Sequence, residues 1–136
     1  MSQTIDWSEE YLVGLEEIDV QHKRIAELIN NILKLSFKHR PKEELLESMD
    51  VLLRYIKWHF ISEEMLMKAY DFPEYVEHRD EHVVLINNLI NKKHEMEQKI
   101  LSVNDLYAFF FGWFGGHAFS ADKDMAPFIS KSIFKT

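Results

Sequence analysis

Apolar residues recur at three- and four-residue steps through most of the chain, which is the period of an α-helix. In the first such segment the repeated positions are Ile25, Leu28, Ile29, Ile32 and Leu33. Similar patterns predict four helices, over about residues 19–37, 41–69, 73–99 and 103–121. With only 4 glycines and 3 prolines in the chain, the connections between these helices are expected to be short.

Several residues mark where the predicted helices begin. Asp19 is a suitable N-cap for the first helix. Pro41 suits the first position of the second helix, and Pro73 opens the third. Ser102 begins a sequence that resembles a capping box for the fourth. Pro127 leaves room only for a short C-terminal helix or turn.

The first 18 residues contain many apolar side chains, but these are not spaced as a helix. We therefore expect residues 1–18 to form an extended arm that packs across the helices. Short connections favour antiparallel neighbours. The sequence thus predicts an all-α fold, an up-down-up-down antiparallel four-helix bundle within one domain over residues 1–136. An N-terminal arm precedes the bundle, and a short C-terminal helix or turn follows it.

The composition excludes several kinds of partner and site. The net charge is −7, which argues against nucleic acid, because binding phosphates needs clusters of Lys and Arg. The chain has no cysteine, so it has no disulfide, thiolate metal site or iron–sulfur cluster. Any metal must be held by His and carboxylate side chains, an environment that suits iron, zinc, copper or manganese.

Membrane insertion and secretion are not expected either. The longest uncharged stretch, residues 106–121, is shorter than the roughly 20 residues that cross a bilayer. Residues 1–6 show no basic segment followed by an apolar one, so the expected compartment is the cytoplasm. The exposed helix faces are well charged, so we expect a monomer.

Five histidines and two carboxylates are spread along the chain, mostly in pairs with helical spacing. They are His22, His59, Glu63, His78, His82, His117 and Asp122. His59 and Glu63 are four residues apart, as are His78 and His82, so each pair shares one helix face. Every predicted helix supplies at least one member. Burying five imidazoles without partners would be costly, and metal coordination removes that cost.

Asp122 fits this pattern least well. It lies five residues after His117, which is about 140° around a regular helix. Either the helix loosens there, for example with a π-type turn, or it ends and the side chain reaches back. Gly115 and Gly116 precede this segment and favour an irregular backbone or close packing. Asp124 is a less suitable substitute ligand.

Seven ligands suit two metal ions better than one. If the two carboxylates bridge the metals, one metal takes three imidazoles and the other takes two, which leaves a vacant position. A redox-active pair with one vacancy in an apolar pocket is suited to reversible dioxygen binding. The ligand spacing alone leaves iron, zinc and manganese as alternatives.

The chain resembles the bacterial hemerythrins from about Ile5 to Phe128. The matching motifs are Ile18-Asp19-Val20-Gln21-His22-Lys23, His59-Phe60-Ile61-Ser62-Glu63-Glu64, His78-Arg79-Asp80-Glu81-His82, and His117 followed by Asp122. The resemblance implies two non-haem iron ions joined by an oxo or hydroxo group. His78, His82 and His117 would bind one iron, His22 and His59 would bind the iron that takes dioxygen, and Glu63 and Asp122 would bridge them.

Two residues depart from the common family pattern near the fourth-helix histidine. Phe114 stands where leucine is common, and Ala118 stands where isoleucine is common. If both line the oxygen pocket, they alter access, affinity and the rate of autoxidation. The alternative is that they only repack the core.

The resemblance implies a dioxygen-binding protein for storage, delivery or sensing, not an enzyme, with dioxygen as ligand and room for an unidentified protein partner. The alternative is a di-iron redox enzyme or sensor acting on oxygen, peroxide or nitric oxide. Ferritin-like oxidases carry paired Glu-x-x-His motifs, and no Glu lies three residues before any His here. A metal-free histidine phosphotransfer bundle would instead need one exposed His.

Overall fold

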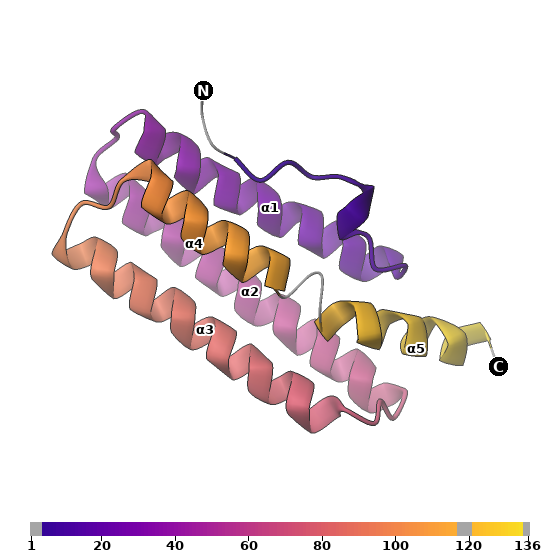
Figure 1. Ribbon diagram of the computed structural model, residues 1–136. Coiled ribbons are helices and arrows are strands. Elements are labelled where there is room, and N and C mark those ends of the chain that lie inside the picture. Colours follow the sequence, from indigo (N-terminus) through magenta and orange to yellow (C-terminus); the bar gives the residue numbers. More distant parts are fainter. Residues whose placement is uncertain (1–3, 117–120, 135–136) are drawn as a thin grey trace.

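The computed structural model describes residues 4–116 and 121–134 of the protein. Within those residues the regular elements are all helical (Figure 1). They are the 3₁₀ helix η1 (Glu9–Tyr11) and the α-helices α1 (Glu16–Phe37), α2 (Lys42–Ala69), α3 (Tyr75–Gln98), α4 (Val103–Gly116) and α5 (Asp122–Phe134).

Helices α1 to α4 run alternately in opposite directions and lie side by side as a bundle (Figure 1). Helix α2 packs against both α1 and α3, and α4 packs against α1. Helix α5 lies beyond the end of α4 and contacts α2. The predicted all-α, up-down-up-down bundle is therefore confirmed.

Helix α1 begins three residues earlier than the sequence predicted, and Asp19 is not its N-cap. The residue before the helix is Leu15. The Asp19 carboxylate instead accepts hydrogen bonds from the backbone N–H groups of Val13, at 2.7 Å, and Gly14, at 3.3 Å. Gly14 has a φ of +92°, a conformation that glycine adopts without strain. Asp19 thus fixes the turn that leads from the arm into α1.

The other predicted helix starts differ by smaller amounts. Pro41 is the residue before α2 and not its first residue, and α3 begins at Tyr75, two residues after Pro73. Ser102 caps α4 as expected, because its Oγ accepts a hydrogen bond from the backbone N–H of Asp105 at 3.1 Å.

The C-terminal part contains more helix than predicted. The fourth helix was expected to reach residue 121: α4 is described to Gly116, residues 117–120 lie outside the described residues, and α5 begins at Asp122. The predicted short C-terminal helix or turn is a helix, α5, which has 13 residues with Pro127 inside it. A proline inside a helix costs about 3 kcal/mol. Burial of the neighbouring Met125, Ala126 and Ile129 offsets that cost.

The N-terminal arm packs across the bundle as predicted. The backbone N–H of Ile5 donates to Asn30 Oδ1 at 2.7 Å, and the Asn30 amide donates back to the Ile5 carbonyl at 2.8 Å. Trp7 and Tyr11 stack on each other, with ring centroids 5.4 Å apart, and both rings contact Phe114 of α4. The arm is therefore attached to α1 by hydrogen bonds and to α4 by aromatic packing.

Two separate groups of buried apolar side chains stabilise the fold. The larger group joins the arm to α1, α2, α3 and α4. The smaller group joins the start of α1 and the end of α2 to α5, and consists of Val13, Ile18, Met67, Phe72, Met125, Ala126 and Ile129. Along α1, His22 lies between Ile18 of the smaller group and Ile25 of the larger one. Along α2, Glu63 likewise lies between Met67 and Phe60, so the histidine and carboxylate residues lie where the two groups meet.

Among the described helices, none combines the length and the apolar character that a membrane span requires.

Candidate metal centre

Six of the seven predicted ligands come together inside the bundle. His22 comes from α1, His59 and Glu63 from α2, His78 and His82 from α3, and Asp122 from the first turn of α5. All six side chains are buried. Because helical spacing places His59 above Glu63 and His78 above His82, α2 and α3 each present two ligands to one interior space.

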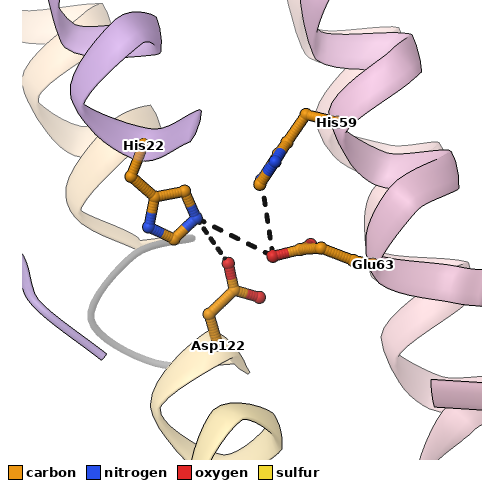
Figure 2. Close-up of side chains that lie close together, drawn as sticks. All are labelled: His22, His59, Glu63 and Asp122. Atoms are coloured by element: carbon orange, nitrogen blue, oxygen red, sulfur yellow. Dashed lines mark ion pairs between the residues drawn. The ribbon is translucent and has the colours of Figure 1, made fainter. Parts of the chain in front are cut away.

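The first histidine group, shown in Figure 2, consists of His22 and His59. Asp122 Oδ2 lies 2.7 Å from His22 Nε2. Glu63 Oε2 lies 3.7 Å from His22 Nε2 and 3.4 Å from His59 Nε2. One oxygen from each carboxylate therefore faces this group.

The second histidine group consists of His78 and His82. Glu63 Oε1 lies 2.9 Å from His82 Nε2 and 3.7 Å from His78 Nε2. Asp122 Oδ1 lies 3.0 Å from His78 Nε2. The other oxygen of each carboxylate therefore faces this second group.

The two carboxylates thus lie between the two histidine groups and direct one oxygen to each. Each histidine group together with Glu63 and Asp122 makes a set of four residues. Within each set, the candidate ligand atoms lie within 4.8 Å of one another. This is the arrangement of two carboxylates that bridge two metal ions, each ion also having imidazole ligands of its own. The nitrogen and oxygen donors suit iron, zinc, copper or manganese.

Polar residues behind two of the histidines orient the rings. His59 Nδ1 lies 2.6 Å from Gln21 Oε1, and His82 Nδ1 lies 2.9 Å from Glu64 Oε2. Both oxygens are acceptors, so each Nδ1–H donates to one of them and each Nε2 is directed inward. The two Nε2 atoms face the Glu63 oxygens at 3.4 and 2.9 Å. A carboxylate oxygen this close to an imidazole nitrogen needs a proton or a metal ion between the two atoms, so the residues fit a metal site.

The same carboxylates change the protonation of His78. Burial lowers the pKa of this imidazole, but hydrogen bonds to Asp122 and Glu63 and the charges of both carboxylates outweigh burial and raise the pKa to about 9. Without a metal, the His78 imidazole therefore carries a second proton at neutral pH. A metal that binds at Nε2 must displace that proton, so metal binding and proton release are coupled.

The remaining candidate residues are distributed as follows. His117 lies outside the described residues, so its ligand role stays a prediction. Asp122 joins the cluster from the first turn of α5, and residue 121 just before it lies in a π-type turn. Asp124, the substitute ligand, is exposed. His39 and His94 are exposed as predicted, and His94 contacts Glu97.

Gln21 and Glu64 were not predicted to have a role. Gln21 directly precedes the candidate ligand His22, and Glu64 directly follows the candidate ligand Glu63. Gln21 also occupies a buried position in the stripe that contains Ile18 and Ile25. Gln21 could have been identified because it is a polar residue on the buried face of its helix. The sequence contains no comparable indication for Glu64.

Phe114 lies beside the first histidine group. It is buried, and its ring meets that of His22 edge-on, with centroids 6.3 Å apart. Phe114 therefore packs in the core and also covers one side of His22. Ala118, the other departure from the family pattern, lies outside the described residues.

Fold and site together define a helical bundle protein that can hold two metal ions between its helices. Residues 13–129 match the sequence model of the hemerythrin HHE cation binding domain, and the chain belongs to the hemerythrin family. Hemerythrins bind dioxygen at a di-iron centre, and the cluster in this chain is placed to hold one.

The curated relatives include three bacteriohemerythrins. The chain is 30% identical to the Stenotrophomonas maltophilia protein over 83 residues. This aligned region covers 61% of this chain and 54% of the relative. The chain therefore spans about half the length of that relative. It is 22% identical over 123 residues to the Clostridium acetobutylicum protein, covering 87% and 95%, and 28% identical over 115 residues to that of Methylococcus capsulatus, covering 82% and 86%.

Solved structures with the same fold include a wild-type hemerythrin. It superposes with a TM-score of 0.82 at 22% identity, covering 93% of this chain and 98% of that chain. A variant of a hemerythrin in which one leucine is replaced by alanine superposes with a TM-score of 0.83 at 23% identity, covering 96% and 99%.

Proposed function

We propose that this protein binds dioxygen reversibly at a di-iron centre formed by the described cluster, and that it stores, delivers or senses oxygen. The observation that carries this proposal is the position of the two carboxylates. Glu63 and Asp122 each direct one oxygen to each of the two histidine groups, as two bridging ligands between two ions would.

The proposed ligand roles follow these two groups. His22 and His59 would hold one iron, His78 and His82 would hold the other together with His117, and Glu63 and Asp122 would supply oxygen ligands between the two histidine groups. The role of His117 rests on the sequence motif. With only two imidazoles, the first histidine group would leave room for dioxygen.

The protein's own residues provide orientation and exclude water. Gln21 and Glu64 hold the rings of His59 and His82 with Nε2 directed inward. Phe60 stacks on the His82 ring with centroids 3.9 Å apart, and Phe114 covers His22. When bound, the iron pair would supply the electrons for reversible dioxygen binding. The apolar surround keeps solvent from the vacant position and slows irreversible oxidation.

Oxygen binding without turnover is proposed in preference to an enzymatic role. The alternative is a di-iron redox enzyme or sensor that acts on oxygen, peroxide or nitric oxide. In the proposed site, protein side chains would occupy most coordination positions of the two ions, which leaves little room for a further substrate. The cytoplasmic location, the monomeric state and an unidentified protein partner stay predictions.

The test is to reduce the iron-loaded protein without oxygen, admit oxygen, and then remove it under argon while recording visible absorption. A reversible carrier gives an oxygen-dependent band that appears on admission and disappears on removal over repeated cycles. Rapid conversion to a stable ferric spectrum after one exposure would favour the redox enzyme or sensor instead.

A metal-depleted sample serves as the control for the same experiment. It is prepared with a chelator, and it must show no band in either gas. If a band forms that is independent of iron content, a di-iron origin of the oxygen response is wrong.

A further inference from the structure

A pocket lies at the end of the bundle opposite the start of α1 and the beginning of α5. The connection from α1 to α2 and the connection from α3 to α4 meet at this end (Figure 1). Together with the adjoining helix ends they line a pocket of about 640 Å³. This volume lies within the range of roughly 300–1,000 Å³ that small-molecule sites occupy. The candidate metal ligands are not among its lining residues.

The interior of this pocket is apolar. Its hydrophobic lining residues come from all four bundle helices or their connections, and include Phe37, Leu45, Met96, Ile100, Leu101 and Leu106. Two of them are unusually exposed for their type, with Ile100 90% and Phe37 44% accessible. An exposed apolar surface of this kind is a common feature of binding sites.

All the lining residues that can carry charge are basic. They are His39, Arg40, Lys42 and Lys99, in a chain whose net charge is −7. Arg40 pairs with Glu44 at 2.9 Å, and Lys42 donates to the backbone carbonyl of Glu97 at 2.8 Å. Within the described part of the chain, Lys99 has no recorded ion pair and remains available for an anion.

We propose that this pocket binds an amphiphilic anion, an acyl chain that ends in a carboxylate. The chain would occupy the apolar interior beside Met96 and Leu106, and the carboxylate would lie at the rim near Lys99 and Arg40. The apolar wall alone would accept any hydrophobic molecule, so the charge of the rim is what selects an anion. The ligand we infer is a free amphiphile, since the volume of about 640 Å³ suits one such molecule.

The test is isothermal titration calorimetry of the iron-loaded protein with dodecanoate below its micelle concentration. Dodecanol and dodecyltrimethylammonium, which share the tail but differ in head charge, are titrated in parallel. We expect one dodecanoate per chain, weaker binding of dodecanol, and no binding of the ammonium compound. Equal affinity for all three would show binding by the tail alone and would overturn the proposal.

Two variants separate the contributions of charge and cavity. Lys99→Glu is expected to weaken dodecanoate binding about fivefold and to leave dodecanol binding unchanged. Lys131→Glu, the same change on an exposed lysine of α5, is the control and should alter neither. Val103→Trp fills part of the pocket and should weaken both ligands. Unchanged dodecanoate binding in Val103→Trp would place the ligand elsewhere and would overturn the proposal.

Two further measurements keep these outcomes interpretable. Thermal unfolding and the visible spectrum of the di-iron centre show whether each variant is folded, and both are expected to match the wild type. Sedimentation with phosphatidylglycerol vesicles distinguishes a membrane lipid from a free amphiphile. If the protein sediments with those vesicles but binds no dodecanoate, the free-ligand assignment is wrong.

Discussion

The two histidine groups of the metal cluster share the same pair of carboxylates, but different residues support them from behind. In the first group, a neutral amide oxygen of Gln21 accepts from His59 Nδ1 at 2.6 Å, and both residues are buried. In the second group, a Glu64 carboxylate oxygen accepts from His82 Nδ1 at 2.9 Å, and the Glu64 side chain is 25% exposed.

This difference gives the two ligand groups different electronic character. An ionised carboxylate behind an imidazole increases the electron donation of that imidazole to a metal, whereas an amide mainly fixes its orientation. We therefore expect the ion held by His78 and His82 to favour the ferric state more strongly than the ion held by His22 and His59. The group with the neutral support is the one proposed to have the vacant position.

The largest effect is expected when a carboxylate that both histidine groups share is removed. Asp122→Asn keeps the shape of the side chain but removes a charge that faces both His22 and His78. We expect the purified protein to lose both iron ions, as measured by elemental analysis. Asp124→Asn, a change of an exposed carboxylate two residues later, should retain both. Full iron content in Asp122→Asn would show that this carboxylate is not a bridge.

Removing one imidazole should affect one group more than the other. His59→Ala deletes a ligand of the first group, and His82→Ala deletes one of the second, so each should lose at least the iron of its own group. Elemental analysis and the visible spectrum measure this loss. His94→Ala removes an exposed histidine of α3 and is the control. If either ligand variant keeps both irons, the assignment of that histidine is wrong.

Exchanging the supporting residues tests the comparison directly. Glu64→Gln should raise the reduction potential of the iron held by the second group, and Gln21→Glu should lower that of the iron held by the first group, because each changes the charge behind one imidazole. Potentiometric titration measures these two shifts in potential. We also expect metal affinity to change about 10- to 100-fold. Shifts of the same sign in the two variants would contradict the proposed asymmetry.

The smallest effect concerns access to the first group. Phe114→Leu should lower the free energy of unfolding by about 1 kcal/mol and speed autoxidation, because it opens space beside His22. Phe110→Leu changes an equally buried phenylalanine one turn earlier in α4 and controls for the loss of packing. Equal autoxidation rates in the two variants would show that Phe114 serves only the core.

The sequence predicted most of the bundle because helical periodicity depends on local spacing alone. It failed where a side chain acts on a neighbouring segment. Asp19 has the residue type of an N-cap, but its carboxylate binds the turn at Val13 and Gly14, and α1 begins earlier. Pro127 left a short terminal helix or a turn as alternatives, and burial of its neighbours in the smaller apolar group supports a helix of 13 residues.

The candidate site was predictable to a similar extent. Paired spacing identified His59 with Glu63 and His78 with His82, because residues four apart share a helix face. The position of Asp122 was left between two alternatives, and the structure places it in the first turn of α5, directly after a π-type turn at residue 121. The roles of Gln21 and Glu64 depend on contacts with residues 38 and 18 positions away, which no local pattern contains.

Because Asp122 is the first residue of α5 as well as a candidate ligand, iron loading and the docking of the C-terminal helix are thermodynamically linked. A carboxylate at this position also interacts favourably with the partial positive charge of the helix N-terminus. In a chain without iron, Asp122 keeps its contacts with His22 and His78 but has no bond to a metal ion, and we expect the smaller apolar group to open more readily. Amide hydrogen exchange in α5 should therefore be slower in the loaded protein than in the metal-free one, so the C-terminal helix reports whether the protein is ready to bind oxygen.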